Sequence, residues 1–216
     1  MSRKSYCSFG KIWEQCLADK SLPTTFMSKD LPLLCQFVKN LDRLACEDIK
    51  ELVVKRVYKR GECIRPANAK TRCIWLIIKG IAFEELPSDH KSIIWEFHFI
   101  GELMGHYNNY VNNAPNYLAL KALKKMECWE IPCDLIAYWY SHDPDFKEIV
   151  NMLTNDSLLW HTDVLPHFKQ NSFEKGWHYL KTNLPQYQAL ISEEKLALFF
   201  DCSSESLRKK LNSISN

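Results

Sequence analysis

The stretch CIWLIIKGIAFEE, Cys73 to Glu85, decides the fold class of this chain. Its apolar residues are mostly isoleucine and aromatic residues, and Lys79-Gly80 interrupts the run. This composition is typical of buried strands, and a glycine inside it is typical of a turn. The stretch therefore predicts two strands joined by a tight turn. It is also too interrupted to cross a bilayer, which takes about 20 apolar residues.

The sequence on both sides continues the strand pattern. In VYKRGECIRP, Gly61 separates two short extended runs. SIIWEFHFI alternates, so its aromatic residues share one face of a strand while Glu96 and His98 share the other. NYLALKALKKMECWEIP predicts two more strands. Several short strands with turn signals between them favour a small barrel or sandwich.

Helical periodicity flanks this β region. LPLLCQFVKNLDRLACEDIKELVV has apolar residues three and four apart, which predicts helix within residues 10–50. PDFKEIVNMLTNDSLLWHTDVLPHF predicts a long helix that Pro166 kinks or ends. SFEKGWHYLKTNLP predicts a shorter helix that ends at Pro185.

The stretch LALFFDCSSESLRKKL, Leu196 to Leu211, predicts two helices separated by a tight turn. Ser192 is placed to cap the first helix, and Asp201-Cys202 forms the turn. Ser203 or Ser204 caps the second helix. Leu207, Leu211 and Ile214 are expected to hold the second helix from beneath, which leaves Ser204, Glu205, Arg208 and Lys209 on an outer face.

Composition is that of an ordinary globular protein. The chain has 216 residues, 46% of them hydrophobic, and a formal net charge of +2, so any nucleic-acid affinity requires a local basic patch. Its nine cysteines are scattered without a C-x-x-C pair, which favours reduced thiols. With no apolar targeting segment at the N-terminus, we expect a cytoplasmic protein.

The order of these elements, together with specific residues, resembles the Crp/Fnr family of bacterial transcription regulators. The motifs that carry the resemblance are YKRGECI with Gly61, WLIIKGIAFEE with Gly80, FIGELM with Gly101 and Glu102, ALKALKKMECWEIP, and YLKTNLP followed by EEKLALFFDCSSESLRKKL. Ala114-Pro115 before the ALKAL strand is most similar to members common in Bacteroidetes.

The resemblance implies an α+β fold in three parts. Residues 1–142 would hold helices and a cyclic-nucleotide-binding-like β-roll, which is a double-stranded β-helix. Residues 143–170 would form a long connecting helix that dimerises the chain, and residues 171–216 a small helix-turn-helix domain. The implied partners are double-stranded DNA, a second copy of the chain, RNA polymerase and an unknown small-molecule effector, with no membrane.

The resemblance also assigns residues to DNA. Family members read bases with an Arg-Glu-x-x-x-Arg pattern, and the matching positions here are Ser204, Glu205 and Lys209. Glu205 would accept a hydrogen bond from a cytosine amino group, and Lys209 would donate to guanine. Ser203 and Arg208 complete the expected DNA-binding set. Three departures are Asp201 in place of a turn glycine, Lys210 at an apolar position, and a chain that stops at Asn216 without a β-hairpin wing.

A second implied site is the effector pocket of the β-roll, with Gly101, Glu102, Asn116 and Tyr117. Gly101 and Glu102 match the pair that holds the ribose of cyclic AMP, but Asn116 stands where the phosphate-binding arginine is expected. A buried phosphate without that guanidinium loses its main compensating interaction. We therefore expect neither cyclic AMP binding nor another cofactor. Glu102 would cap a short helix or contact a different ligand.

Alternatives remain open. A Crp-like fold that has lost DNA binding would act as a ligand- or protein-binding module. His98, Glu102 and His106 are spaced by four and would line one face of a helix, but Gly101 and the preceding strand argue against that helix, so no metal is expected. No catalytic motif is visible in the sequence, so no enzyme activity is expected.

Overall fold

The structure of the protein is a computed structural model that describes residues 53–88, 92–100, 102–144, 146–148, 151, 162, 165–169, 173–183 and 185–215. The helices expected within residues 10–50 lie outside this set. So does most of the connecting helix expected over residues 143–170.

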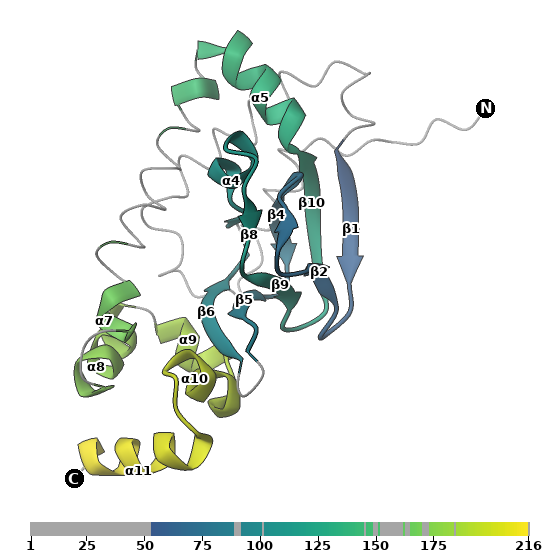
Figure 1. Ribbon diagram of the computed structural model, residues 1–216. Coiled ribbons are helices and arrows are strands. Elements are labelled where there is room, and N and C mark those ends of the chain that lie inside the picture. The colour runs from purple at the N-terminus through teal and green to yellow at the C-terminus, as the bar shows by residue number, and fades with distance from the viewer. Residues whose placement is uncertain are drawn as a thin grey trace.

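The described strands form a roll of two facing antiparallel sheets (Figure 1). The first sheet has the order β1-β10-β4-β7, the second has the order β2-β9-β5-β6, and β3 pairs with β8. The strands are β1 (Val54–Tyr58), β2 (Cys63–Arg65), β3 (Ala69–Lys70), β4 (Cys73–Lys79), β5 (Ala82–Leu86), β6 (Ile93–His98), β7 (Leu103–Met104), β8 (Pro115–Asn116), β9 (Ala119–Ala122) and β10 (Met126–Pro132). The predicted β region is confirmed.

The two strands predicted on either side of a tight turn at Gly80 are confirmed, but they do not pair with each other. β4 and β5 are both present, but they belong to different sheets, so Gly80 and Ile81 form the corner between the sheets. Gly80 has a φ of +93°, and a Cβ at this position would lie 2.5 Å from the carbonyl oxygen of Lys125. Only glycine allows both the backbone angle and this close approach.

Three apolar cores occupy the three layers that the sheets create. The interior of the roll holds Trp75, Ile77, Ala82, Met104, Leu120, Ala122, Met126 and Cys128. On the outer face of the first sheet, Ile74, Leu76 and Ile131 pack against α5 (Cys133–His142). Residues of β4 alternate between these two cores, as a period of two requires.

The remaining helices follow the roll in sequence. They are the short helix α4 (Tyr107–Val111) within the roll, then α7 (Leu165–Lys169), α8 (Phe173–Asn183), α9 (Pro185–Leu190), α10 (Glu193–Phe199) and α11 (Ser204–Ser215). Pro185 starts α9 after α8 has ended, as expected. Pro166 lies in the first turn of α7 as that helix is described, where its missing N–H costs little. The residues directly before Leu165 lie outside the described residues, so the expected kink or end at Pro166 stays a prediction. No helix within the described ranges is long and apolar enough to cross a membrane.

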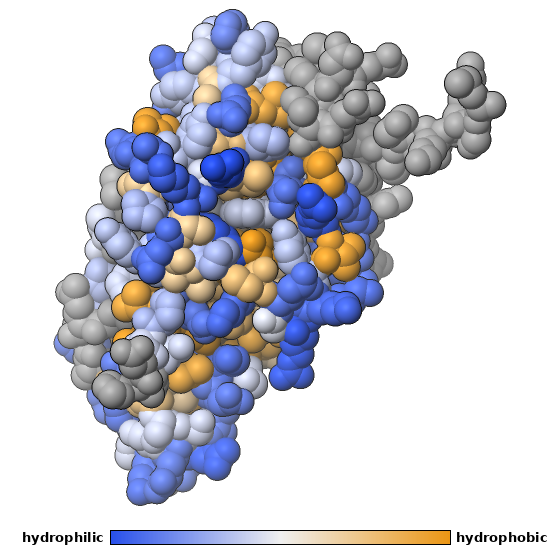
Figure 2. All heavy atoms as spheres, turned by 45° about the vertical axis from the view of Figure 1, so that its right-hand side comes forward, coloured by the Kyte–Doolittle hydropathy of each residue, from blue (hydrophilic) through white to orange (hydrophobic). Residues whose placement is uncertain are grey.

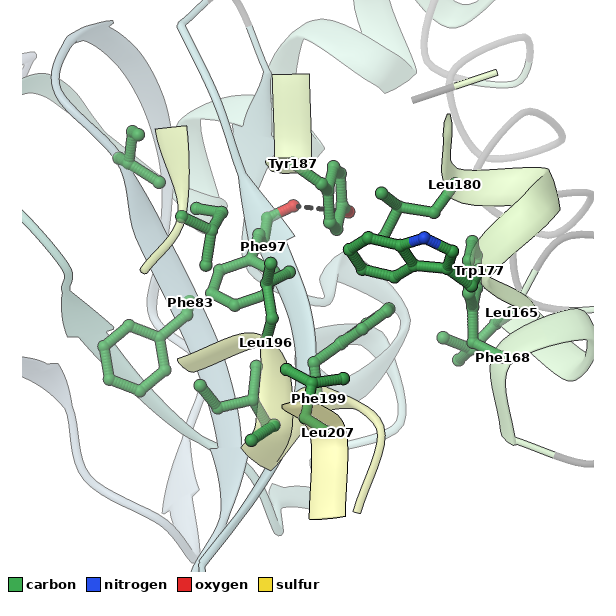
Figure 3. Close-up of a cluster of buried hydrophobic side chains, with 14 of the residues drawn as sticks. Phe83, Phe97, Leu165, Phe168, Trp177, Leu180, Tyr187, Leu196, Phe199 and Leu207 are labelled. Atoms are coloured by element: carbon green, nitrogen blue, oxygen red, sulfur yellow. Dashed lines mark hydrogen bonds between the residues drawn. The ribbon is translucent and has the colours of Figure 1, made fainter. Parts of the chain in front are cut away.

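The C-terminal helices pack directly on the outer face of the second sheet. One buried cluster joins the second sheet to these helices (Figure 3). The sheet contributes Phe83 from β5, Phe97 from β6 and Phe99 just after β6, and the helices contribute Tyr187 and Phe199. The Tyr187 hydroxyl donates to the carbonyl oxygen of Phe97 at 3.5 Å. Because one core spans both regions, the position of α10 is tied to strand β6.

Candidate functional site

Helices α10 and α11 form the expected helix-turn-helix. Ser192 occupies the N-cap position of α10, with extended backbone angles but, within the described residues, no side-chain cap hydrogen bond. Asp201, which stands in place of the usual turn glycine, adopts a left-handed φ of +51°, an angle that aspartate tolerates better than most residues. The N–H of Cys202 donates to the carbonyl oxygen of Ala197 at 2.9 Å and closes the turn.

Local capping and one buried leucine fix helix α11. Ser203 is its cap, because its Oγ accepts a hydrogen bond from the N–H of Ser206 at 3.1 Å. Leu207 is fully buried beneath the helix, and Leu211 packs partly against the same core. Ile214 is 41% exposed, so the expectation that it anchors the helix is wrong. The helix is therefore held at its start and middle.

The basic side chains of α11 face solvent. Arg208 and Lys209 keep 67% and 76% of their side-chain surface exposed. Arg208 Nε lies 2.5 Å from Glu193 Oε1 of α10, an ion pair without hydrogen-bond geometry, and Lys209 Nζ lies 2.7 Å from Glu205 Oε1. Hydrophilic side chains gather at the lower end of the molecule (Figure 2), where Figure 1 places α11. Exposed ion pairs are weak, so a competing anion can displace these carboxylates.

Lys210 occupies a position that was expected to be apolar, and the structure supplies a reason. Its Nζ lies 5.1 Å from the ring centroid of Phe173 on α8, a cation–π contact. The aliphatic stem of lysine covers apolar surface while its ammonium stays near water. Lys210 therefore joins α11 to α8 rather than disturbing the helix-turn-helix.

The residues expected to form the effector pocket divide between interior and surface. Gly101 lies outside the described residues. Glu102 Oε2 accepts the N–H of Phe99 at 3.0 Å, so it caps the turn after β6 and not a helix. Asn116 is 3% exposed, and its Oδ1 accepts the N–H of Leu118. Tyr117 is 68% exposed, so its side chain lies away from this interior.

Sequence reasoning missed a buried ion network at the centre of the roll. Glu84 Oε1 accepts from Arg65 Nη2 at 3.0 Å, and Glu84 Oε2 lies 3.0 Å from His106 Nε2. Arg65 and Glu84 have only 4% and 1% of their side chains exposed. Burial opposes ionisation of Glu84, but the hydrogen bond from His106 and the charges of His106, His98 and Arg65 lower its pKa to about 2. Glu84 is therefore a carboxylate.

Strand β6 adds two more ionisable residues to the interior. Glu96 pairs with Glu84 and His98 pairs with Ala82 across the two strands, so all four side chains share one face. Ala82 belongs to the interior core, which places this face inside the roll. Burial opposes protonation of His98, yet Glu96, Glu102 and Glu84 raise its pKa to about 9. The predicted alternation of β6 is confirmed, and its polar face is the interior one.

Comparison with solved structures identifies the fold. The chain matches a cyclic nucleotide-binding domain containing protein from Listeria monocytogenes with a TM-score of 0.66, at 17% identity, over 83% of this chain and 90% of that chain. It matches FixK2 from Bradyrhizobium japonicum with a TM-score of 0.62, at 14% identity, over 76% of this chain and 84% of that chain. It also matches a protein from Eubacterium rectale that is assigned to the crp/fnr family of transcriptional regulators. That match has a TM-score of 0.62 at 14% identity, and it covers 81% of this chain and 86% of that chain.

No protein-family model matches the sequence, and no curated protein matches it. At these identities the structural matches establish the fold. The chain has the fold of Crp/Fnr regulators, which confirms the expected α+β class with a cyclic-nucleotide-binding-like roll. The likeness to members from Bacteroidetes and the part boundaries at residues 142 and 170 stay predictions.

Proposed function

We propose that this chain, which shares its fold with Crp/Fnr regulators, is a DNA-binding transcription regulator and not an enzyme. The observation that carries the proposal is helix α11, which presents Arg208 and Lys209 to solvent from a capped and anchored position. A helix held in this way can enter a major groove with its N-terminal half toward the bases. Ser203, Ser204 and Glu205 at its start are then the further base or phosphate contacts.

In this proposal three side chains of α11 contact the DNA, namely Glu205, Arg208 and Lys209. Glu205 accepts from a cytosine amino group once Lys209 has left it for a guanine, since carboxylate and ammonium have complementary partners in the groove. Arg208 leaves Glu193 for a backbone phosphate. Such exchanges release counterions, which makes binding steeply dependent on salt.

We further propose that the regulator is a cytoplasmic homodimer, with RNA polymerase as a downstream partner. Two α11 helices would reach successive major grooves about 34 Å apart on a pseudo-palindrome. The segment expected to join the protomers, residues 143–170, lies largely outside the described residues. The structural matches to FixK2 and to the crp/fnr regulator from Eubacterium rectale support the proposal, because they cover 76% and 81% of this chain.

The effector of the proposed regulator is not cyclic AMP. Asn116, which matches the position of the phosphate-binding arginine in the family pattern, is 3% exposed, and an amide cannot balance a phosphate charge. Arg65 is buried in the same interior, but Glu84 already pairs with its guanidinium. A cyclic phosphate would have to compete with this carboxylate at close range.

Binding to fragmented genomic DNA from the source organism tests the proposal. The chain is expected to enrich discrete palindromic fragments at low salt, less at physiological salt, and to lose them in the Arg208→Ala/Lys209→Ala variant. Lys59→Ala/Arg60→Ala is the matched control, because it removes one lysine and one arginine from an exposed turn of the roll. Equal enrichment by both double variants would refute the role of α11.

A second function follows from the ion pairs of α11. Glu193 and Glu205 already neutralise Arg208 and Lys209, so a Crp-like module without DNA binding is the alternative. Binding to DNA that is absent, or that does not respond to salt between low and physiological concentration, would favour this module over the regulator.

A further inference from the structure

The interior face of β5 and β6 carries three side chains of the types that bind metals, and the proposed DNA contacts use none of them. Glu84 and Glu96 lie directly opposite each other in the strand register, and His98 follows Glu96 by two residues on the same face. One ring nitrogen of His98 and one carboxylate oxygen from each glutamate all lie within 4.8 Å of one another. Two adjacent strands therefore bring these three donors together.

His98 offers a buried ring nitrogen to such a site. The residue is 8% exposed, and its Nε2 has no hydrogen-bond partner among the residues that the structure describes. Its Nδ1 lies 3.8 Å from Glu102 Oε2, which is longer than a hydrogen bond. A buried ring nitrogen without a partner is uncommon in folded proteins, and a bound metal ion would satisfy it.

The charges around His98 favour a cation. Glu84, Glu96 and Glu102 contribute three negative charges, and Arg65 contributes one positive charge at 3.0 Å from Glu84. Three carboxylates close to one buried imidazole attract a cation rather than an anion.

We propose that Glu84, Glu96 and His98 bind a divalent transition-metal cation inside the roll. Imidazole nitrogen and carboxylate oxygen suit Zn²⁺, Mn²⁺, Fe²⁺ and Co²⁺, with bonds of about 2.0–2.2 Å. Donors within 4.8 Å of one another need only a small inward shift to reach that distance. When the metal binds, the ring proton of His98 passes to solvent, and Arg65 and His106 hold the Glu84 carboxylate in place.

Cobalt(II) is the probe that separates this site from the thiols of the chain. A cobalt ion held by nitrogen and oxygen shows no thiolate-to-metal charge-transfer band, whereas one held by cysteine does. The full-length protein, purified without a histidine tag and freed of metal by a chelator, is titrated with CoCl₂ by calorimetry and absorption. We expect one cobalt per chain, no thiolate band, and a higher melting temperature with metal than without.

Two variants assign the ligands. Glu96→Gln and His98→Gln are each expected to weaken cobalt binding at least tenfold, while His178→Gln, at an exposed histidine of α8, leaves it unchanged. Glu96→Gln keeps the size and shape of a half-buried side chain, so it carries the test if His98→Gln does not fold. The proposal is overturned by an absence of binding, by a thiolate band, or by binding that Glu96→Gln leaves intact. None of these outcomes bears on DNA binding, which is measured separately.

Discussion

The rings of Phe97 and Phe199 lie with their centroids 5.6 Å apart, at an interplanar angle of 45°. Phe97 belongs to strand β6 of the roll and Phe199 to the last turn of α10, so this contact joins the sensor-like roll to the helix-turn-helix. Glu96 and His98, the neighbours of Phe97 in β6, point to the opposite face of the strand, into the roll. Adjacent residues of β6 therefore contact the roll interior and helix α10.

Phe199→Ala is expected to destabilise the whole protein by about 3–5 kcal/mol, because it opens a cavity in a core that both regions share. Phe199 has no exposed surface and contacts Phe97, Phe168 and Tyr187. Urea denaturation followed by circular dichroism measures the loss. Tyr117→Ala, at a side chain that is 68% exposed, is the control and should change little. A loss below about 1 kcal/mol in Phe199→Ala would contradict the shared core.

Arg65→Met should cost about 3–5 kcal/mol, since it leaves the Glu84 carboxylate buried without its guanidinium. The exposed pair between Lys55 and Glu127, whose atoms lie 2.7 Å apart, gives the comparison. Lys55→Met is expected to cost less than about 1 kcal/mol. Urea denaturation in the presence of a chelator measures both, so that no metal contributes. Similar losses in the two variants would show that the buried network adds nothing.

Gly80→Ala is predicted to destabilise the roll by about 3 kcal/mol or more, through backbone strain and a clash with Lys125. Gly61 is a matched control: its φ is +80°, but nothing lies within 4 Å of an added Cβ. Gly61→Ala should therefore cost only the left-handed strain, about 1 kcal/mol. Thermal unfolding measures the melting temperatures of the two variants, and that of Gly80→Ala should be the lower. Equal melting temperatures would mean that the corner relaxes.

The thiols of Cys128 and Cys133 should resist alkylation at pH 8.5. Burial raises the pKa of each to about 12, so little of either is the reactive thiolate at that pH. Peptide mass spectrometry after iodoacetamide treatment should show exposed Cys63 reacting at least tenfold faster. In urea the three rates should become similar. Comparable rates in the folded protein would contradict the burial of these thiols.

The raised pKa values of Cys128 and Cys133 also predict how the stability of the protein changes at alkaline pH. Above the unfolded thiol pKa of about 8.5, the unfolded chain loses protons that folded Cys128 and Cys133 retain. The unfolded state is then favoured, so these groups make stability fall as pH rises from about 9 toward 12. Unfolding curves of the wild type and of Cys128→Ala should converge over this range.

Features that depend on neighbouring residues alone could be predicted from the sequence. The cap at Ser203, the left-handed Asp201 and the alternation of β6 all follow from backbone preferences that act over a few residues. The error at Ile214 shows the limit of this reasoning. A spacing of i, i+4 and i+7 marks one face of a helix, but it does not show how far the supporting core extends.

The sequence by itself thus determined the strands of the roll and the exposed basic helix α11, with its cap and its turn. Only the tertiary structure decided that Glu84 meets Arg65 from β2 and His106 beyond β7, because these contacts join segments that are 19 and 22 residues away. Alternation gives a strand two faces without saying which is buried. In β6 the rest of the roll covers the face with His98, and α10 covers the face with Phe97. Both faces are buried by parts of the chain that are distant in the sequence, which is why the local pattern could not show it.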